Sequence, residues 1–201
     1  MPRGDESRRI ARRHIQKLLE YRPAIVEAAK DYEIGSFAQF YTQKRVTLAP
    51  WVLAGIISRE TNVANIEGDY IDPKRKLSPR GFGLCQITIP YHRAWVDKWL
   101  AGTLPGYEGK PRDPTANIRK GAEILSERIR YFRDKGPAKL SNGALLRAAV
   151  AAYNASLQRV AEVVRAGGDP DVCTTGKDYA EDVLTRGAVF KDNGFGPDET
   201  I

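Results

Sequence analysis

One carboxylate, Glu60, lies at the end of the otherwise apolar segment PWVLAGIISRE. Leu53, Ile56 and Ile57 precede it by seven, four and three residues, so the helical period places all four side chains on one face. Apolar neighbours disfavour the charged form of a carboxyl group and raise its pKa, and the negative end of the helix dipole acts in the same direction. A carboxyl group that is still protonated near neutral pH can act as a general acid. An ion pair with an arginine at the helix end is the simpler alternative.

Two further carboxylates, Asp69 and Asp72, follow Glu60 by nine and twelve residues in a polar segment that contains glycine and proline. This composition predicts a loop over 62–81, which opens from the end of the Glu60 helix. One carboxyl group in apolar surroundings and one in polar surroundings are the equipment for cleaving a glycosidic bond. A turn-forming role for Asp69 is the alternative, because loop aspartates commonly have that role.

Other catalytic chemistries have little support in the sequence. His14 and His92 are the only histidines, and neither has a partner at metal-ligand spacing. No nucleophile elbow is present, and GFG at 81–83 lacks the glycine pattern of a phosphate-binding loop. We therefore expect no metal and no cofactor. The two cysteines, Cys85 and Cys173, are expected to be buried small hydrophobes, and a disulfide between them is the alternative.

The spacing of apolar residues predicts a mainly α-helical domain. Proline at the first turn marks the start of several of its helices, and glycine marks some of their ends. The short apolar run over 81–89 is expected to form a strand or hairpin edge. The alanines of 141–156 predict that this helix is the central and most buried one. Helices are predicted over 6–20, from Pro23 to Gly35, over 50–61, from Pro114 to Gly136, over 141–156 and over 177–191.

The charge balance of 32 basic and 25 acidic residues gives a net charge of +7. Such a protein is attracted to polyanions, which include nucleic acid, anionic membranes and acidic cell walls. No motif that reads DNA or RNA is present, so we expect no specific nucleic acid partner. No apolar run approaches the roughly 18 residues that span a bilayer. The basic N-terminus lacks an apolar core and a cleavage site, so we expect no secretion signal.

Seven motifs, taken in order, resemble the goose-type lysozymes and the wider lytic transglycosylase group that shares their fold. The resemblance covers about residues 48–192. It implies a lysozyme-like α-helical catalytic domain over 46–201, with a small β-hairpin lining the substrate cleft, preceded by a basic helical extension over 1–45. The motifs are ISRETN (57–62), GD (68–69), GFGLCQIT (81–88), YH (91–92), NIRKGAEIL (117–125), AAYNAS (151–156) and TTGKDYAEDV (174–183).

The resemblance implies a peptidoglycan-degrading muramidase. Glu60 matches the general acid that protonates the β-1,4 bond between N-acetylmuramic acid and N-acetylglucosamine. Asp69 matches an aspartate that helps to hold or activate the attacking water. The remaining matched positions are expected to bind substrate or to border the cleft: Gly83, Leu84, Gln86, Thr88, Tyr91, His92, Tyr153, Asn154 and Tyr179.

Thr88 departs from the family pattern, because goose-type lysozymes usually have a second aspartate there. Threonine can orient a water but cannot act as a base. With Asp69 as the base we expect hydrolysis with inversion at the anomeric carbon. Without it, Glu60 alone would act as acid and then base, and attack by the sugar's own 6-hydroxyl would leave a 1,6-anhydro product, as in lytic transglycosylases. A non-catalytic glycan-binding module is a third alternative.

The expected partner is the peptidoglycan glycan strand, bound by a monomer. The basic N-terminal helix is expected to draw the protein to an anionic wall or membrane surface. We expect a protein made in the cytoplasm that reaches the cell wall as a phage endolysin or as a delivered effector. An extracellular enzyme whose signal has been removed would have the same sequence features.

Overall fold

The computed structural model describes residues 3–39, 42–66, 81–137 and 140–196. The fold is mainly α-helical, as the sequence predicts, and contains two small antiparallel hairpins, of which the sequence predicts only the one near residues 81–88. The first hairpin pairs β1 (Glu33–Gln39) with β2 (Thr42–Thr47), and the second pairs β3 (Gly81–Phe82) with β4 (Ile87–Thr88). The helices are α1 (Arg3–Leu19), α2 (Arg22–Asp31), α3 (Pro50–Thr61), α4 (Ile89–Ala101), α5 (Pro114–Lys135), α6 (Asn142–Asn154), α7 (Leu157–Arg165) and α8 (Tyr179–Phe190), with short helical turns η1 (Pro170–Cys173), η2 (Thr175–Lys177) and η3 (Lys191–Phe195).

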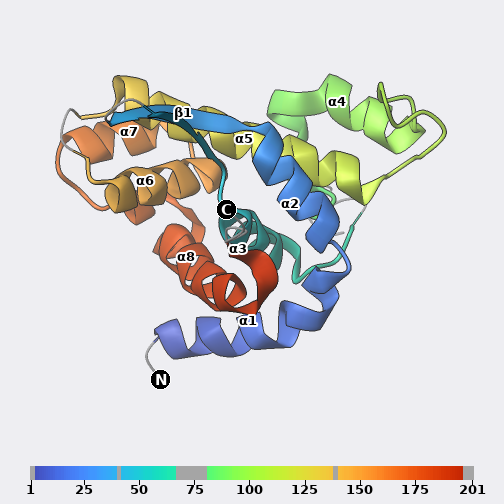
Figure 1. Ribbon diagram of the computed structural model, residues 1–201, viewed down its shortest axis with the longest axis horizontal. Helices are drawn as coiled ribbons and strands as arrows, with labels where there is room; N and C mark the ends of the chain where they lie inside the picture. Colours follow the sequence, from blue (N-terminus) through green and yellow to red (C-terminus); the bar gives the residue numbers. More distant parts are fainter. Residues whose placement is uncertain (1–2, 40–41, 67–80, 138–139, 197–201) are drawn as a thin grey trace, which may run out of the picture.

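Helix α3 lies near the centre of the molecule, with α8 beside it and α1 packed against α8 (Figure 1). Eight of the twelve residues of α3 are buried, whereas α6 buries five of thirteen. The expectation that 141–156 forms the most buried helix is therefore wrong. The five alanine and valine residues over 148–152 do reach the core, but the start of α6 lies at the surface.

Two glycines allow α3 and α8 to approach closely. A Cβ atom on Gly55 would lie 2.5 Å from the carbonyl oxygen of Val183, and one on Gly187 would lie 2.6 Å from the Trp51 ring. Both distances are shorter than any van der Waals contact, so neither position has room for a side chain. This contact fixes the end of α3 relative to the start of α8, and those two helix ends carry the residues described below.

Helix α1 contributes to the same core as the rest of the chain. Ala11 and Leu18 are fully buried, and His14 Nδ1 lies 2.9 Å from the hydroxyl oxygen of Ser58 in α3. The helix predicted to end at Gly35 ends at Asp31, and β1 follows it. The predicted domain boundary after residue 45 falls within β2. Among the described helices, none combines the length and the apolar character needed to cross a bilayer.

Candidate active site

Helix α3 carries Glu60 from the core to its edge. The helix begins with Pro50 in its first turn and ends at Thr61, followed by the cap residue Asn62, which has a left-handed φ of 51°. Residues 52–58 are buried, whereas Glu60 is partly exposed. The predicted placement is therefore confirmed, since the acid follows a buried apolar segment and still reaches the surface.

The Glu60 carboxyl group accepts a hydrogen bond from the hydroxyl of Tyr179, the first residue of α8. Burial raises the pKa of Glu60 to about 7, against the lowering effects of the Tyr179 hydrogen bond and the Arg59 charge. Burial and the nearby Glu60 charge also raise the pKa of Tyr179 well above its ordinary value, so its hydroxyl stays a donor. A carboxyl group with this pKa is protonated in a large fraction of molecules near neutral pH, as a general acid requires.

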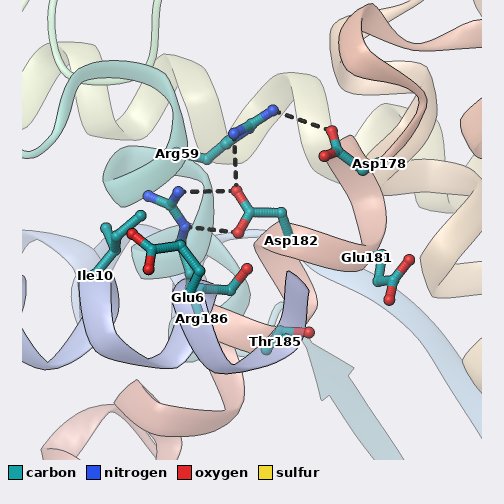
Figure 2. Close-up of a pocket in the computed structure, with 10 residues that line it drawn as sticks. Glu6, Ile10, Arg59, Asp178, Glu181, Asp182, Thr185 and Arg186 are labelled. Carbon is teal, nitrogen blue, oxygen red and sulfur yellow. Dashed lines mark hydrogen bonds and ion pairs between the residues drawn. The ribbon is translucent and has the colours of Figure 1, made fainter. Parts of the chain in front are cut away.

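An ion pair between Glu60 and an arginine at the helix end is the simpler alternative to a protonated Glu60, and Arg59 is the arginine at that end. Arg59 pairs with other carboxylates instead. Its guanidinium pairs with Asp178 and Asp182, as the dashed lines in Figure 2 show. The distances are 3.2 Å to Asp178 Oδ1 and 3.0 Å to Asp182 Oδ2. It also lies over the Tyr179 ring, 5.9 Å from the ring centroid. In the described part of the chain, no basic side chain lies within ion-pair distance of Glu60. Among the described residues, no ion pair therefore opposes the effect of burial on the pKa of Glu60.

Side chains from α5 and α6 fix the turn between β3 and β4 beside this acid. Asn117 of α5 is fully buried; its Oδ1 accepts the Cys85 N–H at 2.8 Å, and its Nδ2 donates to the Phe82 carbonyl oxygen at 3.0 Å. The Tyr153 hydroxyl of α6 donates to the Cys85 carbonyl oxygen at 2.8 Å. Gly83 has a φ of 70°, and a Cβ atom there would lie 2.2 Å from the Asn117 side chain. The turn is therefore bonded to two helices.

Sequence reasoning did not assign a role to Asn117. The signal is its spacing from Gly121, four residues later on the same face of α5. A Cβ atom on Gly121 would lie 2.5 Å from Cys85 Sγ, so both α5 residues face the same turn. A polar residue and a glycine one helical turn apart within a buried apolar face indicate that another backbone approaches the helix there.

A groove of about 320 Å³ lies beside Tyr153, and we call it the Tyr153 groove. It is lined by β4, the first turn of α4, the middle of α5, the end of α6 and the start of α7. Helix α4 has a kink at His92 (φ −134°, ψ 28°), one of the residues that line the groove. The lining residues are Gln86, Ile87, Thr88, Tyr91, His92, Ile124, Arg128, Ala152, Tyr153, Asn154, Ala155, Ser156, Leu157 and Gln158.

The structure brings six of the nine predicted substrate-binding residues together in the Tyr153 groove: Gln86, Thr88, Tyr91, His92, Tyr153 and Asn154. Tyr179 is buried and contacts Glu60 instead. Gly83 and Leu84 are buried, and the Gly83 N–H is already bonded to the Ile66 carbonyl oxygen at 2.6 Å. Contact of these nine residues with substrate stays a prediction.

Tyr153 connects the groove to the acid. Burial raises the pKa of Tyr153 well above its ordinary value, and the nearby Cys85 and Glu60 act in the same direction. Burial likewise raises the pKa of Cys85, again with a contribution from Glu60.

Cys85 and Cys173 are both free thiols, although Cys173 is only half-buried. Asp69, the predicted partner of Glu60, lies outside the described residues, as does Asp72.

Comparisons with known proteins show the family to which this chain is similar. The family model described as Lysozyme g matches residues 4–194, a span that includes α1 as well as the motif region. The lysozyme g of Gallus gallus is 30% identical over 148 residues, which are 74% of this chain and 59% of that protein. Those of Struthio camelus and Casuarius casuarius are each 27% identical over 94% of this chain, and the matches cover 74% and 82% of the two proteins. The chain thus spans less than two thirds of the Gallus gallus protein.

Proposed function

We propose that this chain, which belongs to the lysozyme g family of glycoside hydrolases, is a muramidase that cleaves the β-1,4 bond between N-acetylmuramic acid and N-acetylglucosamine in peptidoglycan. One observation carries the proposal. Glu60 is held in an apolar site by the Tyr179 hydroxyl, is free of any described ion pair and has a pKa raised to about 7.

In the proposed reaction, Glu60 gives its proton to the glycosidic oxygen as the bond to the anomeric carbon breaks. The carboxylate left behind is the charged form, and the Tyr179 hydroxyl is placed to donate a hydrogen bond to it. Tyr179 therefore favours the state that follows proton transfer, while burial favours the state that precedes it. General acid catalysis of this kind contributes roughly 10²- to 10⁴-fold in rate.

For the second half of the reaction, we propose that Asp69 holds the attacking water, which gives hydrolysis with inversion. Inverting glycosidases keep their two carboxyl groups about 6.5–9.5 Å apart to leave room for that water. Thr88 lines the Tyr153 groove and supports this role only as a hydrogen-bonding group, because its hydroxyl is not a base at neutral pH.

Lytic transglycosylation is the second candidate, and two observations favour it. Thr88 occupies the position of the family's second aspartate, and Glu60 has a pKa of about 7. A group with that pKa can give a proton and then take one back at neutral pH, so Glu60 alone would suffice. The 6-hydroxyl of muramic acid would then replace water as the nucleophile.

The mass of the products from purified peptidoglycan tests both candidates, because hydrolysed muropeptides are one water heavier than 1,6-anhydro products. We expect the parent chain to release the heavier products and Glu60→Gln to release none at a comparable rate. Glu162→Gln, which changes an exposed carboxylate of α7, is the matched control and should keep parental activity. If the parent binds the glycan without releasing reducing ends, it is a binding module and the proposal is wrong.

We also propose that α1 contacts an anionic wall or membrane surface. Arg12, Arg13 and Lys17 are exposed on α1, whereas Arg8 and Arg9 pair with acidic residues of the preceding turn. Removal of the helix would not test this, because α1 contributes buried side chains to the core. Substitution of the exposed charges tests it without a loss of packing.

A further inference from the structure

One guanidinium in the Tyr153 groove has no acidic partner in the part of the chain that the structure describes. Arg128 belongs to α5, one turn after Ile124, and both side chains line the groove. Its Nε atom is buried and has no hydrogen-bond acceptor among the described residues. No described carboxylate lies within ion-pair distance of it. The Nε atom of Arg147 is likewise buried without an acceptor, but its guanidinium pairs with Asp169 and Asp171 at 3.0 and 3.2 Å. Buried donors in proteins nearly always have partners, so Arg128 needs one.

The surroundings of Arg128 favour an anion. None of the other thirteen groove residues is an aspartate or a glutamate. Burial lowers the pKa of His92 below its ordinary value; Lys120 and Arg128 act in the same direction, whereas Glu123 and Glu127 oppose it. Glu123, an acidic neighbour on α5, is paired with Lys120 at 2.6 Å. The positive charge of Arg128 is therefore not neutralised within the groove.

Two further donors lie in the same groove. Leu157 and Gln158 are the first two residues of α7, so the positive end of that helix lies at the groove wall. Asn154 uses its Oδ1 to accept the Thr175 N–H at 3.0 Å, which leaves its amino group as a donor. A guanidinium, an amide donor and a helix N-terminus together match the acceptor oxygens of a carboxylate.

We propose that Arg128 binds a carboxylate of the substrate, so that the Tyr153 groove is a subsite for the acidic substituent of muramic acid. The inference rests on the proposed function. N-acetylglucosamine carries no charge, whereas muramic acid carries a lactyl ether whose carboxylate is either free or extended by an acidic peptide. Because Tyr153 lies close to Glu60, a carboxylate held by Arg128 would fix the muramic acid ring relative to the acid.

Binding in the Glu60→Gln background, measured by calorimetry, tests this without turnover of the ligand. Three probes are used: a chitin oligosaccharide with no carboxylate, a peptide-free glycan with lactyl carboxylates, and a peptide-bearing glycan. We expect Arg128→Gln to weaken binding of a carboxylate-bearing glycan by roughly 10- to 100-fold, from the strength of hydrogen bonds to charged groups. The loss for the chitin oligosaccharide should be at least tenfold smaller. Whichever glycan shows the larger loss identifies the lactyl or the peptide carboxylate.

Arg130→Gln is the matched control, since Arg130 is an exposed arginine of the same helix. Arg128→Lys keeps the charge without the bidentate geometry. It should lose less affinity than Arg128→Gln, and again mainly for the carboxylate-bearing glycans. If Arg128→Gln does not fold, Arg128→Lys is used in its place. Equal losses on all three probes, no loss on any, or no binding by the background chain would each overturn the inference. Cleavage of peptidoglycan by the parent is measured separately, so failure of the proposed function is distinguishable from failure of this subsite.

Discussion

The hydrogen bond from Tyr179 to Glu60 gives the sharpest prediction about the proposed acid. Tyr179→Phe keeps the buried ring and removes only the hydroxyl that donates to the carboxyl group. That bond lowers the pKa of Glu60, so its loss should raise the pKa above the present value of about 7. A hydrogen bond to a charged group contributes about 1.5–3 kcal/mol, and one pKa unit corresponds to about 1.4 kcal/mol. The pKa of Glu60 should therefore rise by about one to two units.

The pH dependence of kcat/KM on purified peptidoglycan measures this change. The protonated form of a general acid is the active one, so the alkaline limb of the profile reports its pKa. In Tyr179→Phe this limb should move from about pH 7 to about pH 8–9. The maximal rate should fall as well, because the variant lacks the donor that stabilises the carboxylate formed by proton transfer.

Tyr153→Phe is the control, because it removes a second buried phenolic hydroxyl that donates to the Cys85 carbonyl oxygen and not to Glu60. Its alkaline limb should stay near that of the parent, even if its rate falls. A limb that does not move in Tyr179→Phe, or that moves to lower pH, would show that the hydroxyl does not control the acid.

Three further predictions follow from the same structure. Burial raises the pKa of Glu60 from 4.5 to about 7, so the stability of the wild-type protein falls as pH rises through this interval. After allowance for the partial exposure of Glu60, Glu60→Gln should raise the free energy of unfolding at about pH 8 by about 1–2 kcal/mol. It should leave the free energy of unfolding unchanged at about pH 4, and urea denaturation measures both values. Gly55→Ala should lower the free energy of unfolding by about 1–3 kcal/mol, whereas Gly143→Ala, where a Cβ atom meets nothing within 4 Å, should not lower it. Charge reversal of Arg12 and Arg13 should slow the clearing of intact cells at low salt more than digestion of soluble glycan, and equal losses would contradict a surface role for α1.

Local signals in the sequence were sufficient to predict where most of the helices lie. The helix predicted over 50–61 is α3 (Pro50–Thr61), because proline at its start and the polar residues after it act within one turn. The same holds for α5, where the Asp113 side chain accepts the Ala116 N–H as an N-cap and Gly136 follows the last turn. The position of Glu60 beyond a buried apolar face followed from this local pattern.

The features that the sequence did not predict depend on contacts between residues that lie far apart in the chain. The alanines of α6 suggested the central helix, but Gly55 and Gly187 bring α3 and α8 into the closest contact, and glycine in a helix is normally read as a weakness. The β1–β2 hairpin was missed because Gly35 was interpreted as a helix end. The hydrogen bonds of Asn117 join residues more than thirty positions apart, so no window of the sequence contains both partners.

The two arginines near the site show why position matters more than net charge in this basic protein. Arg59 precedes Glu60 directly, and an unpaired guanidinium there would lower the pKa of the proposed acid further. Asp178 and Asp182 pair with Arg59 and offset its charge, so burial dominates at Glu60. Arg128 lines the Tyr153 groove and has no such partner among the described residues, so its charge stays available to an anionic ligand. Among the described residues, the same side-chain type is therefore neutralised beside the proposed acid and left without an acidic partner in the groove that is proposed to bind a charged substrate.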